Sequence, residues 1–201
     1  MAVIFISVAT SAGFLSTQVG KDAMLEQADR SLQSFGARLN DEQYAQMQAR
    51  LTGPTATYVS AAGQLVALPL FAAVAAGLLI AVFNGVMAGN ASFKQVFAIV
   101  VHASFLSALQ QLFTFPLDYA KQSLASPTTL AVFLPFLDEG TFAARFFGFI
   151  DLFRIWWIVN LAIGIGVLYR KRTTPIATTM LVIYGVIALI VAAAGVALSG
   201  A

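Results

Sequence analysis

The sequence predicts an all-α integral membrane bundle of about five transmembrane helices, with an amphipathic helical loop between the first two helices. Three observations support this fold class. Of the 201 residues, 59% are hydrophobic, and the mean hydropathy is +0.84. Only 10% are charged, whereas an ordinary soluble domain has about 25% charged residues. The charges are also clustered, because none lies between Arg50 and Lys94 or after Arg172.

Each long apolar stretch is a candidate span, because a transmembrane helix needs about 20 predominantly apolar residues. Helices are expected, since no segment alternates as a barrel strand does and an open sheet edge cannot be satisfied in lipid. The five expected spans are residues 1–16, 61–87, 93–115, 145–169 and 174–198. The first is short and no Lys or Arg precedes it, unlike a signal peptide. We expect a spanning helix that is short or lacks some N-terminal residues, with a cleaved or interfacial segment as the alternative.

The loop at residues 19–56 is expected to form an amphipathic helical element. Gly36 weakens the centre of its helical pattern. Asn40 and Gln43 then resemble a capping box, which begins a second helix that ends at Gly53-Pro54. We expect the apolar face to pack on the chain's own transmembrane helices, with a docking face for a partner as the alternative. The apolar residues that recur at helical spacing are Leu25, Leu32, Phe35 and Leu39.

A second apolar segment, residues 128–137, is too short to span a membrane. We expect it to be interfacial or re-entrant, with a kink at Pro135. A pore helix would need a polar filter, and the sequence shows none.

Basic residues predict the orientation of the chain. Arg170, Lys171 and Arg172 form the one basic triplet, and Lys94 follows the short loop between the second and third spans. We therefore expect these four residues on the cytoplasmic side of a cytoplasmic (inner) membrane. The N-terminus would be cytoplasmic, and the C-terminus and both long loops would lie on the opposite side.

Two ionisable residues stand three apart in the expected fourth span. Asp151 and Arg154 would share one helix face, within reach of a charge-assisted contact. An intramembrane ionisable residue is a functional candidate by default. The alternative is a pair that neutralises itself and orients the helix.

His102 lies within the expected third span and is the only histidine of the chain. It is a candidate proton relay or a possible axial ligand to a tetrapyrrole such as haem or chlorophyll. A hydrogen bond to a carbonyl or a neighbouring helix is the structural alternative. We expect Asn84, Gln110 and Asn160 to make interhelical hydrogen bonds rather than to bind a substrate.

Composition excludes several classes of function. A net charge of +2 gives no field for binding nucleic acid. The absence of Cys excludes disulfides, thiolate metal sites and cysteine nucleophiles. No metalloprotease, phosphate-loop, nucleophile-elbow or paired-carboxylate motif is visible in the spans. We therefore expect no enzyme activity and no metal site, and the sequence requires no cofactor.

Two blocks of the sequence carry the pattern of a known family. In the block Phe83–Phe105, the residues that form it are Gly85, Gly89, Phe93, Lys94, Gln95 and Ser104. In the block Ile150–Arg170, they are Asp151, Phe153, Trp156, Gly164 and Arg170. With these residues the chain resembles the Yip1-domain family of polytopic membrane proteins, in its bacterial form. Arg154 departs from the family pattern, which has a small polar residue there.

The resemblance implies five transmembrane helices, a cytoplasmic N-terminus and an exported C-terminus. Eukaryotic relatives bind small GTPases through a cytoplasmic N-terminal region. This sequence shows no such region, so we do not expect that activity. The resemblance implies no settled biochemical role for the bacterial form.

Three functional hypotheses follow. The first is a non-catalytic structural or accessory subunit of a larger membrane complex, with the lipid bilayer and other subunits or a second copy as partners. The second is a small transporter or proton-coupled permease that uses Asp151, Arg154 and His102, and it predicts a water-accessible cavity that joins them. The third is a pigment- or haem-bearing subunit, which requires His102 to face the exterior of the bundle or a partner.

Overall fold

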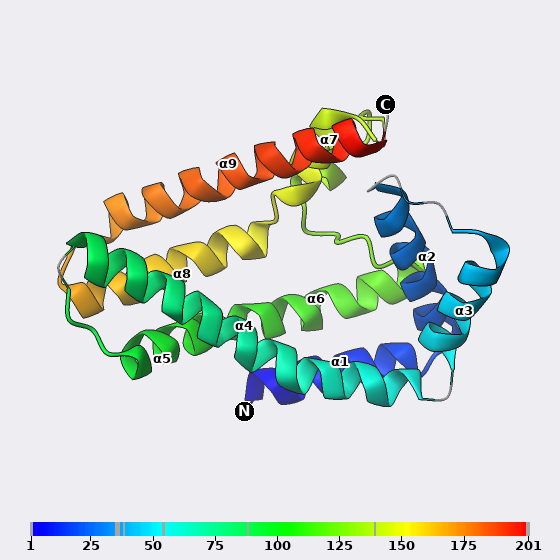
Figure 1. Ribbon diagram of the computed structural model, residues 1–201, viewed down its shortest axis with the longest axis horizontal. Coiled ribbons are helices and arrows are strands. Elements are labelled where there is room, and N and C mark those ends of the chain that lie inside the picture. The colour runs from blue at the N-terminus through cyan, green and yellow to red at the C-terminus, as the bar shows by residue number, and fades with distance from the viewer. Residues whose placement is uncertain are drawn as a thin grey trace.

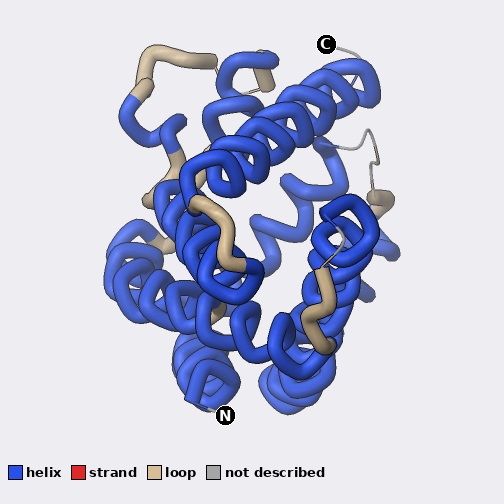
Figure 2. The backbone as a smooth tube through the Cα atoms, turned by 90° about the vertical axis from the view of Figure 1, so that its left-hand side faces the viewer, coloured by secondary structure: helices blue, strands red, loops and turns tan. Residues whose placement is uncertain are grey.

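The computed structural model describes residues 2–34, 37, 39–53, 55–87, 89–138 and 140–199. Within these ranges all regular secondary structure is helical, and the loops are short (Figure 1, Figure 2). The elements are α1 (Ala2–Leu15), α2 (Gln18–Ser34), α3 (Asp41–Thr52), α4 (Ala56–Met87), α5 (Phe93–Ala103), α6 (Phe105–Lys121), the 3₁₀ helix η1 (Leu130–Phe133), α7 (Phe142–Phe149), α8 (Leu152–Tyr169) and α9 (Thr173–Ser199).

Four stretches of the described chain are helical, long and apolar enough to cross a membrane, which indicates a membrane protein. A fifth span is obtained only if α1 and α2 count as one, and a bend of 100° separates them. The expected number of five is therefore reached only with this bent pair. The four stretches are Ala56–Gly85, Phe93–Lys121, Leu152–Tyr169 and Thr173–Leu198.

The core lies where α4, α5, α8 and the start of α9 meet. Small side chains let these backbones approach closely, as in other membrane bundles. At Gly164 of α8, an added Cβ would lie 2.5 Å from the Ile99 side chain of α5, so that any larger residue would force Ile99 to move. The buried residues of this core are Ala72, Ala76, Phe83, Val96, Val100, Ala103, Leu161, Ala162, Ile165 and Ile176.

The third span is longer than the expected 93–115. The chain bends slightly at Ser104, between α5 and α6, and then stays helical through Pro116 to Lys121. A proline inside a helix removes one backbone hydrogen bond and crowds the preceding turn. Here the helix continues, so Pro116 does not mark its end.

The fourth span is not the continuous helix expected at 145–169. It is divided into α7 and α8, with a break at Ile150 and Asp151. At the break, the Leu130 N–H donates to the Ile150 carbonyl and the Leu152 N–H donates to the Thr128 carbonyl. These bonds form an isolated antiparallel bridge between Thr129 and Asp151. Pairing with a distant segment therefore replaces the local helical bonds.

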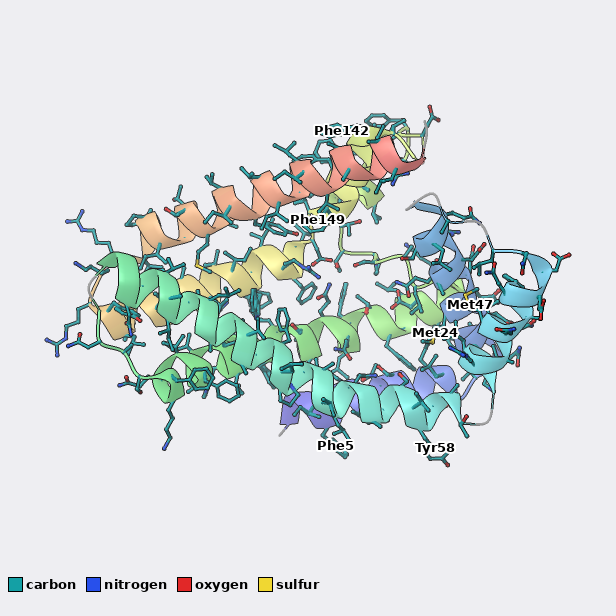
Figure 3. The ribbon with its side chains drawn as sticks, viewed as in Figure 1. Phe5, Met24, Met47, Tyr58, Phe142 and Phe149 are labelled. Atoms are coloured by element: carbon teal, nitrogen blue, oxygen red, sulfur yellow. The ribbon has the colours of Figure 1, made fainter. Side chains whose placement is uncertain are left out.

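The loop at 19–56 contains α2 and α3, and its predicted capping box is confirmed. The Gln43 N–H donates to Asn40 Oδ1 at 2.8 Å, and the Asn40 N–H donates to Gln43 Oε1 at 3.1 Å. Leu25 is buried, and α2 packs on α1, α3 and α9, as expected for a face that covers the chain's own helices. Met24 and Met47 lie where α2 and α3 meet (Figure 3). The predictions for Phe35, Gly36 and Pro54 fall outside the described residues.

The segment 128–137 forms no α-helix, and its expected interfacial or re-entrant placement stays a prediction. It is extended at Thr129, forms one 3₁₀ turn in η1 and then continues as turns. Its η1 portion packs against α7. Phe133 and Phe136 are 63% and 76% exposed, so the segment presents its largest side chains outward.

Candidate functional site

The carboxylate of Asp151 caps the N-terminus of α8. Its Oδ1 accepts hydrogen bonds from the backbone N–H groups of Phe153 and Arg154, at 2.9 and 3.1 Å. The first N–H groups of a helix have no partner within the helix, and an aspartate at the N-cap satisfies them. Asp151 is only 6% exposed. Its first role is therefore to begin α8 inside the protein.

The second oxygen of Asp151 binds three side chains from other parts of the chain. Oδ2 accepts from Gln110 Nε2 at 3.0 Å, from Ser126 Oγ at 3.0 Å and from Thr128 Oγ1 at 2.5 Å. Gln110 also donates to Thr128 Oγ1 at 3.0 Å. Gln110 belongs to α6, and the two hydroxyls belong to the loop that follows it. The carboxylate thus joins α6, this loop and the start of α8.

Tyr184 of α9 closes the same junction from the opposite side. Its hydroxyl donates to the Phe149 carbonyl at 2.5 Å, and the Asp151 N–H donates to it at 3.4 Å. This hydroxyl therefore satisfies two backbone groups that the break between α7 and α8 releases. We refer to Gln110, Ser126, Thr128, Asp151 and Tyr184 as the Asp151 cluster.

The Asp151 cluster is suited to holding structure. Five donors from the protein point at one buried carboxylate, so its acceptor sites are occupied by the chain itself. A pocket of about 570 Å³ is lined by Ser126 and Thr129 but not by Asp151. A carboxylate that neither faces a pocket nor lacks partners is poorly placed to exchange protons or bind substrate.

The expectation that the side chains of Asp151 and Arg154 contact each other is wrong. In the described part of the chain, the ion pair that forms is the one between Arg30 and Glu26, both on α2. The break before α8 turns the Asp151 carboxylate toward the backbone N–H groups, whereas the Arg154 side chain is exposed. A three-residue spacing predicts a shared face only when both residues lie inside the helix.

Asn84 makes the interhelical bonds that were predicted for it. Its Nδ2 donates to the Ala91 carbonyl at 2.9 Å, and the Ala91 N–H donates to its Oδ1 at 3.2 Å. The Tyr169 hydroxyl of α8 also donates to Oδ1, at 2.7 Å. Asn84 therefore fastens the end of α4 to the turn before α5 and to the end of α8.

His102 and Asn160 bond only within their own helices. His102 Nδ1 lies 3.1 Å from the Ala98 carbonyl, and Asn160 Nδ2 donates to the Trp156 carbonyl at 3.0 Å. The prediction of an interhelical bond for Asn160 is therefore wrong. A carbonyl can only accept, so Nδ1 of His102 carries the proton and Nε2 of the neutral ring keeps its lone pair.

The two residues nevertheless share one pocket. A groove of about 410 Å³ between α5 and α8 is lined by both, and His102 is exposed. Small neighbours, including Ala98, Ala103 and Gly164, leave room beside the ring. Asp151 and Arg154 do not line this groove. The structure therefore does not bring together the three residues named for a transporter.

The four basic residues that predict the orientation lie at one end of the bundle. Arg170 ends α8 in the left-handed conformation, with φ 53°, and Lys171 and Arg172 follow it in the link to α9. Lys94 lies in the first turn of α5. This turn and the link lie at the same end (Figure 1), where Asn84 bonds Tyr169.

Sequence reasoning missed three members of the Asp151 cluster. Ser126 and Thr128 belong to a polar run just before the apolar part of 128–137, and hydroxyls at that place are an available signal. Tyr184 is the single phenol of α9 and lies in its apolar part, so it too could have been noted as a polar group in need of a partner.

Neither metal ligation nor similarity identifies a function. Within the described ranges, no three His, Cys, Asp or Glu side chains lie close enough together to hold a metal ion. Comparison with the models of known families, with curated proteins and with solved structures gives no match. The Yip1 resemblance therefore stays a prediction.

Proposed function

We propose that this protein is a non-catalytic integral membrane protein that serves as a structural or accessory subunit of a larger membrane assembly. The observation that carries the proposal is how little of each spanning helix the chain covers. In the most apolar part of α4, 11% of the residues are buried, and the other three spans reach 22–28%. Most of the apolar surface of these helices is thus available to lipid or to other subunits.

One face of α4 illustrates this surface. Side chains four residues apart form a continuous exposed stripe along the helix, which is the geometry by which membrane helices pack on one another. Phe5 of α1 and Tyr58 of α4 also point away from the bundle (Figure 3). The stripe consists of Val66 (68% exposed), Leu70 (60%), Val74 (54%), Leu78 (64%) and Val82 (52%).

The character of the buried polar groups supports the same proposal. The Asp151 cluster and Asn84 hold helices in place, and neither the Asp151 carboxylate nor Asn84 lines any of the pockets described above. The transporter hypothesis lacks such support, because Asp151 and Arg154 do not line the groove that holds His102. We retain the expectation of a Yip1-like protein of the bacterial cytoplasmic membrane, with the basic triplet on the cytoplasmic side.

Cysteine cross-linking tests the proposal, since the chain has no native Cys. Val74→Cys places a thiol on the exposed stripe, and Ala76→Cys places one at a fully buried position of the same helix. In native membranes, a maleimide cross-linker should join Val74→Cys, but not Ala76→Cys, to a protein of different mass. An adduct of twice the chain's mass would identify a homo-oligomer. Monomer alone for both variants, on cross-linking and on native gels in mild detergent, would contradict the proposal.

The same approach tests the orientation. Asn90→Cys lies in the turn before α5, and Ala125→Cys lies in the loop after α6. A membrane-impermeant maleimide added to intact cells should label Ala125→Cys only. Labelling of Asn90→Cys alone would reverse the proposed orientation.

A second candidate function is the binding of a tetrapyrrole by His102. The specific observation is that Nε2 of an exposed histidine is left with a free lone pair beside a groove. An absorption spectrum of the mildly solubilised complex tests it. A Soret or chlorophyll band that shifts or disappears in His102→Leu, and persists in Asn160→Leu, would support this function. A spectrum without such a band would exclude it.

A further inference from the structure

A second groove, between α4 and α9, combines apolar walls with two cations at one end. It has a volume of about 690 Å³, which is within the range of about 300–1,000 Å³ typical of ligand sites. Lys171 and Arg172 line one end. Figure 1 shows α4 and α9 diverging from the end where these two residues lie. The walls include Leu78, Val82 and Phe83 of α4, and Ile176, Met180 and Ile183 of α9.

The length of the groove matches one leaflet of a bilayer. From Arg172 to Ile183 the helix advances about 16 Å, at about 1.5 Å per residue. The hydrocarbon core of a bilayer is about 30 Å thick. A groove that begins at the interface beside two cations therefore ends near the middle of the membrane. A spanning helix of a partner would continue through both leaflets, whereas a lipid chain ends where this groove ends.

The charge at this end of the molecule is of one sign. Lys94, Arg170, Lys171 and Arg172 lie there, and the chain has no Asp or Glu between Glu42 and Asp118 or after Asp151. Within the described residues, neither Lys171 nor Arg172 forms an ion pair through its side chain, and both are exposed. An arginine can bind a phosphate oxygen pair through two N–H groups, and a lysine adds a point charge.

We propose that this groove is a binding site for an anionic phospholipid. One acyl chain lies between α4 and α9, and the phosphate is held by Lys171 and Arg172. Basic pockets between transmembrane helices are a recognised form of lipid headgroup site. The groove shares Leu78 and Val82 with the exposed stripe of α4, but Val74, the position chosen for cross-linking, does not line it. The proposed lipid site does not depend on the proposed accessory function.

Lipid binding to the purified full-length chain tests this proposal. The readout is native mass spectrometry from detergent with added phosphatidylglycerol, and phosphatidylcholine serves as the uncharged comparison. The unaltered chain should retain phosphatidylglycerol and bind phosphatidylcholine at least about tenfold more weakly. The double variant Lys171→Gln/Arg172→Gln should lose most of this preference. Equal retention of the two lipids by the unaltered chain would overturn the proposal.

Lys94→Gln is the matched charge control, because Lys94 lies at the same end of the bundle but does not line the groove. It should leave phosphatidylglycerol binding within about twofold of the unaltered chain. If it weakens binding as much as Lys171→Gln does, the attraction is a general surface effect and the site is refuted.

A second pair of variants tests the apolar part without changing any charge. Thr179→Trp fills the groove, since Thr179 lines it and is exposed. Val182→Trp adds the same bulk to an exposed position of α9 outside the groove. Thr179→Trp should reduce phosphatidylglycerol binding at least about fivefold, and Val182→Trp should not. Equal binding by the two variants would mean that the groove does not hold the acyl chain and would overturn the proposal. Full displacement of the lipid by inorganic phosphate would show that an ion alone is held, and it would overturn the proposal as well.

Discussion

The Asp151 cluster and the His102 groove are two polar regions in the apolar part of one chain, and they are built in opposite ways. Asp151 is 6% exposed, and its second oxygen is bonded by side chains of α6 and the following loop. His102 is exposed and bonds only the Ala98 carbonyl of its own helix. The Asp151 cluster joins α6, the loop after it and the start of α8, whereas the His102 groove leaves Nε2 of His102 without a hydrogen bond to the described part of the chain.

The comparison separates polar residues that hold a membrane bundle together from those that are available to a ligand. A buried polar group deprived of its partner costs about 1–3 kcal/mol. Interhelical hydrogen bonds in membranes contribute about 0.6 kcal/mol on average. Residues of the Asp151 cluster should therefore matter for stability, and residues of the His102 groove should not.

The largest effect is expected for Asp151→Ala. It removes the cap of α8, leaves the buried hydroxyl of Thr128 without its carboxylate acceptor and removes one of the two acceptors of the Gln110 amide. We expect the free energy of unfolding to fall by about 3 kcal/mol. Asp151→Asn keeps an oxygen at the cap and should cost about half as much. The measurement is reversible unfolding in detergent micelles. If Asp151→Ala lowers the free energy of unfolding by less than about 0.5 kcal/mol, the Asp151 cluster does not differ from the His102 groove in its contribution to stability.

Gln110→Leu should lower the free energy of unfolding by about 1–2 kcal/mol, because the Gln110 amide donates to both Thr128 and Asp151. Combined with Thr128→Val, the loss should differ from the sum of the single losses by more than about 0.5 kcal/mol. Gln111→Leu is the matched control, since Gln111 bonds Ser7 of α1. Its effect should add to that of Thr128→Val. Additivity for both glutamines would show that the cluster does not act as a unit.

Two asparagines extend the comparison with one residue type. Asn84 bonds Ala91 and Tyr169, whereas Asn160 bonds a carbonyl of its own helix. Asn84→Leu should lower the free energy of unfolding by about 2 kcal/mol. Asn160→Leu should change it by less than about 0.5 kcal/mol. The same micelle assay measures both, and the reverse order would contradict the contrast between joined and open polar residues.

The smallest effects are expected for His102→Leu and Arg154→Gln, each within about 0.5 kcal/mol of the unaltered chain. His102→Leu removes one bond to a carbonyl of the same helix. Arg154→Gln removes a cation near the N-terminus of α8, where positive charge is unfavourable, so any change should be stabilising. A loss above about 1 kcal/mol for Arg154→Gln would mean that the residue has a partner in the membrane.

Local signals in the sequence predicted local structure correctly. The capping box of Asn40 and Gln43 was found from their spacing alone, because both bonds join residues three apart. The apolar stretches likewise predicted the long helices, since length and hydropathy suffice for that. The third span was expected to end at residue 115, whereas the helix continues through Pro116 to Lys121, because one lost backbone hydrogen bond does not end it.

The Asp151 cluster could not be predicted in the same way. The side chains that bond the Asp151 carboxylate are 23 to 41 positions away in the sequence, and the break before α8 coincides with the pairing of Thr129 and Asp151. Within the segment FFGFIDLFRIWW, no glycine–proline pair marks that break. The sequence indicated Asp151 as an important residue but suggested the wrong partner. A pattern along one helix cannot show which distant hydroxyls reach a carboxylate.

The bonds of Asn84 and of the Asp151 cluster also imply an order of assembly during synthesis. Asn84 bonds Ala91 only seven residues later, so the turn between α4 and α5 can close soon after both helices emerge from the ribosome. The junction between α7 and α8 must wait for Tyr184, 33 residues after Asp151. Until α9 is made, the nascent chain carries exposed backbone groups at this junction. The junction between α7 and α8 is therefore completed late in synthesis, after the turn that Asn84 closes.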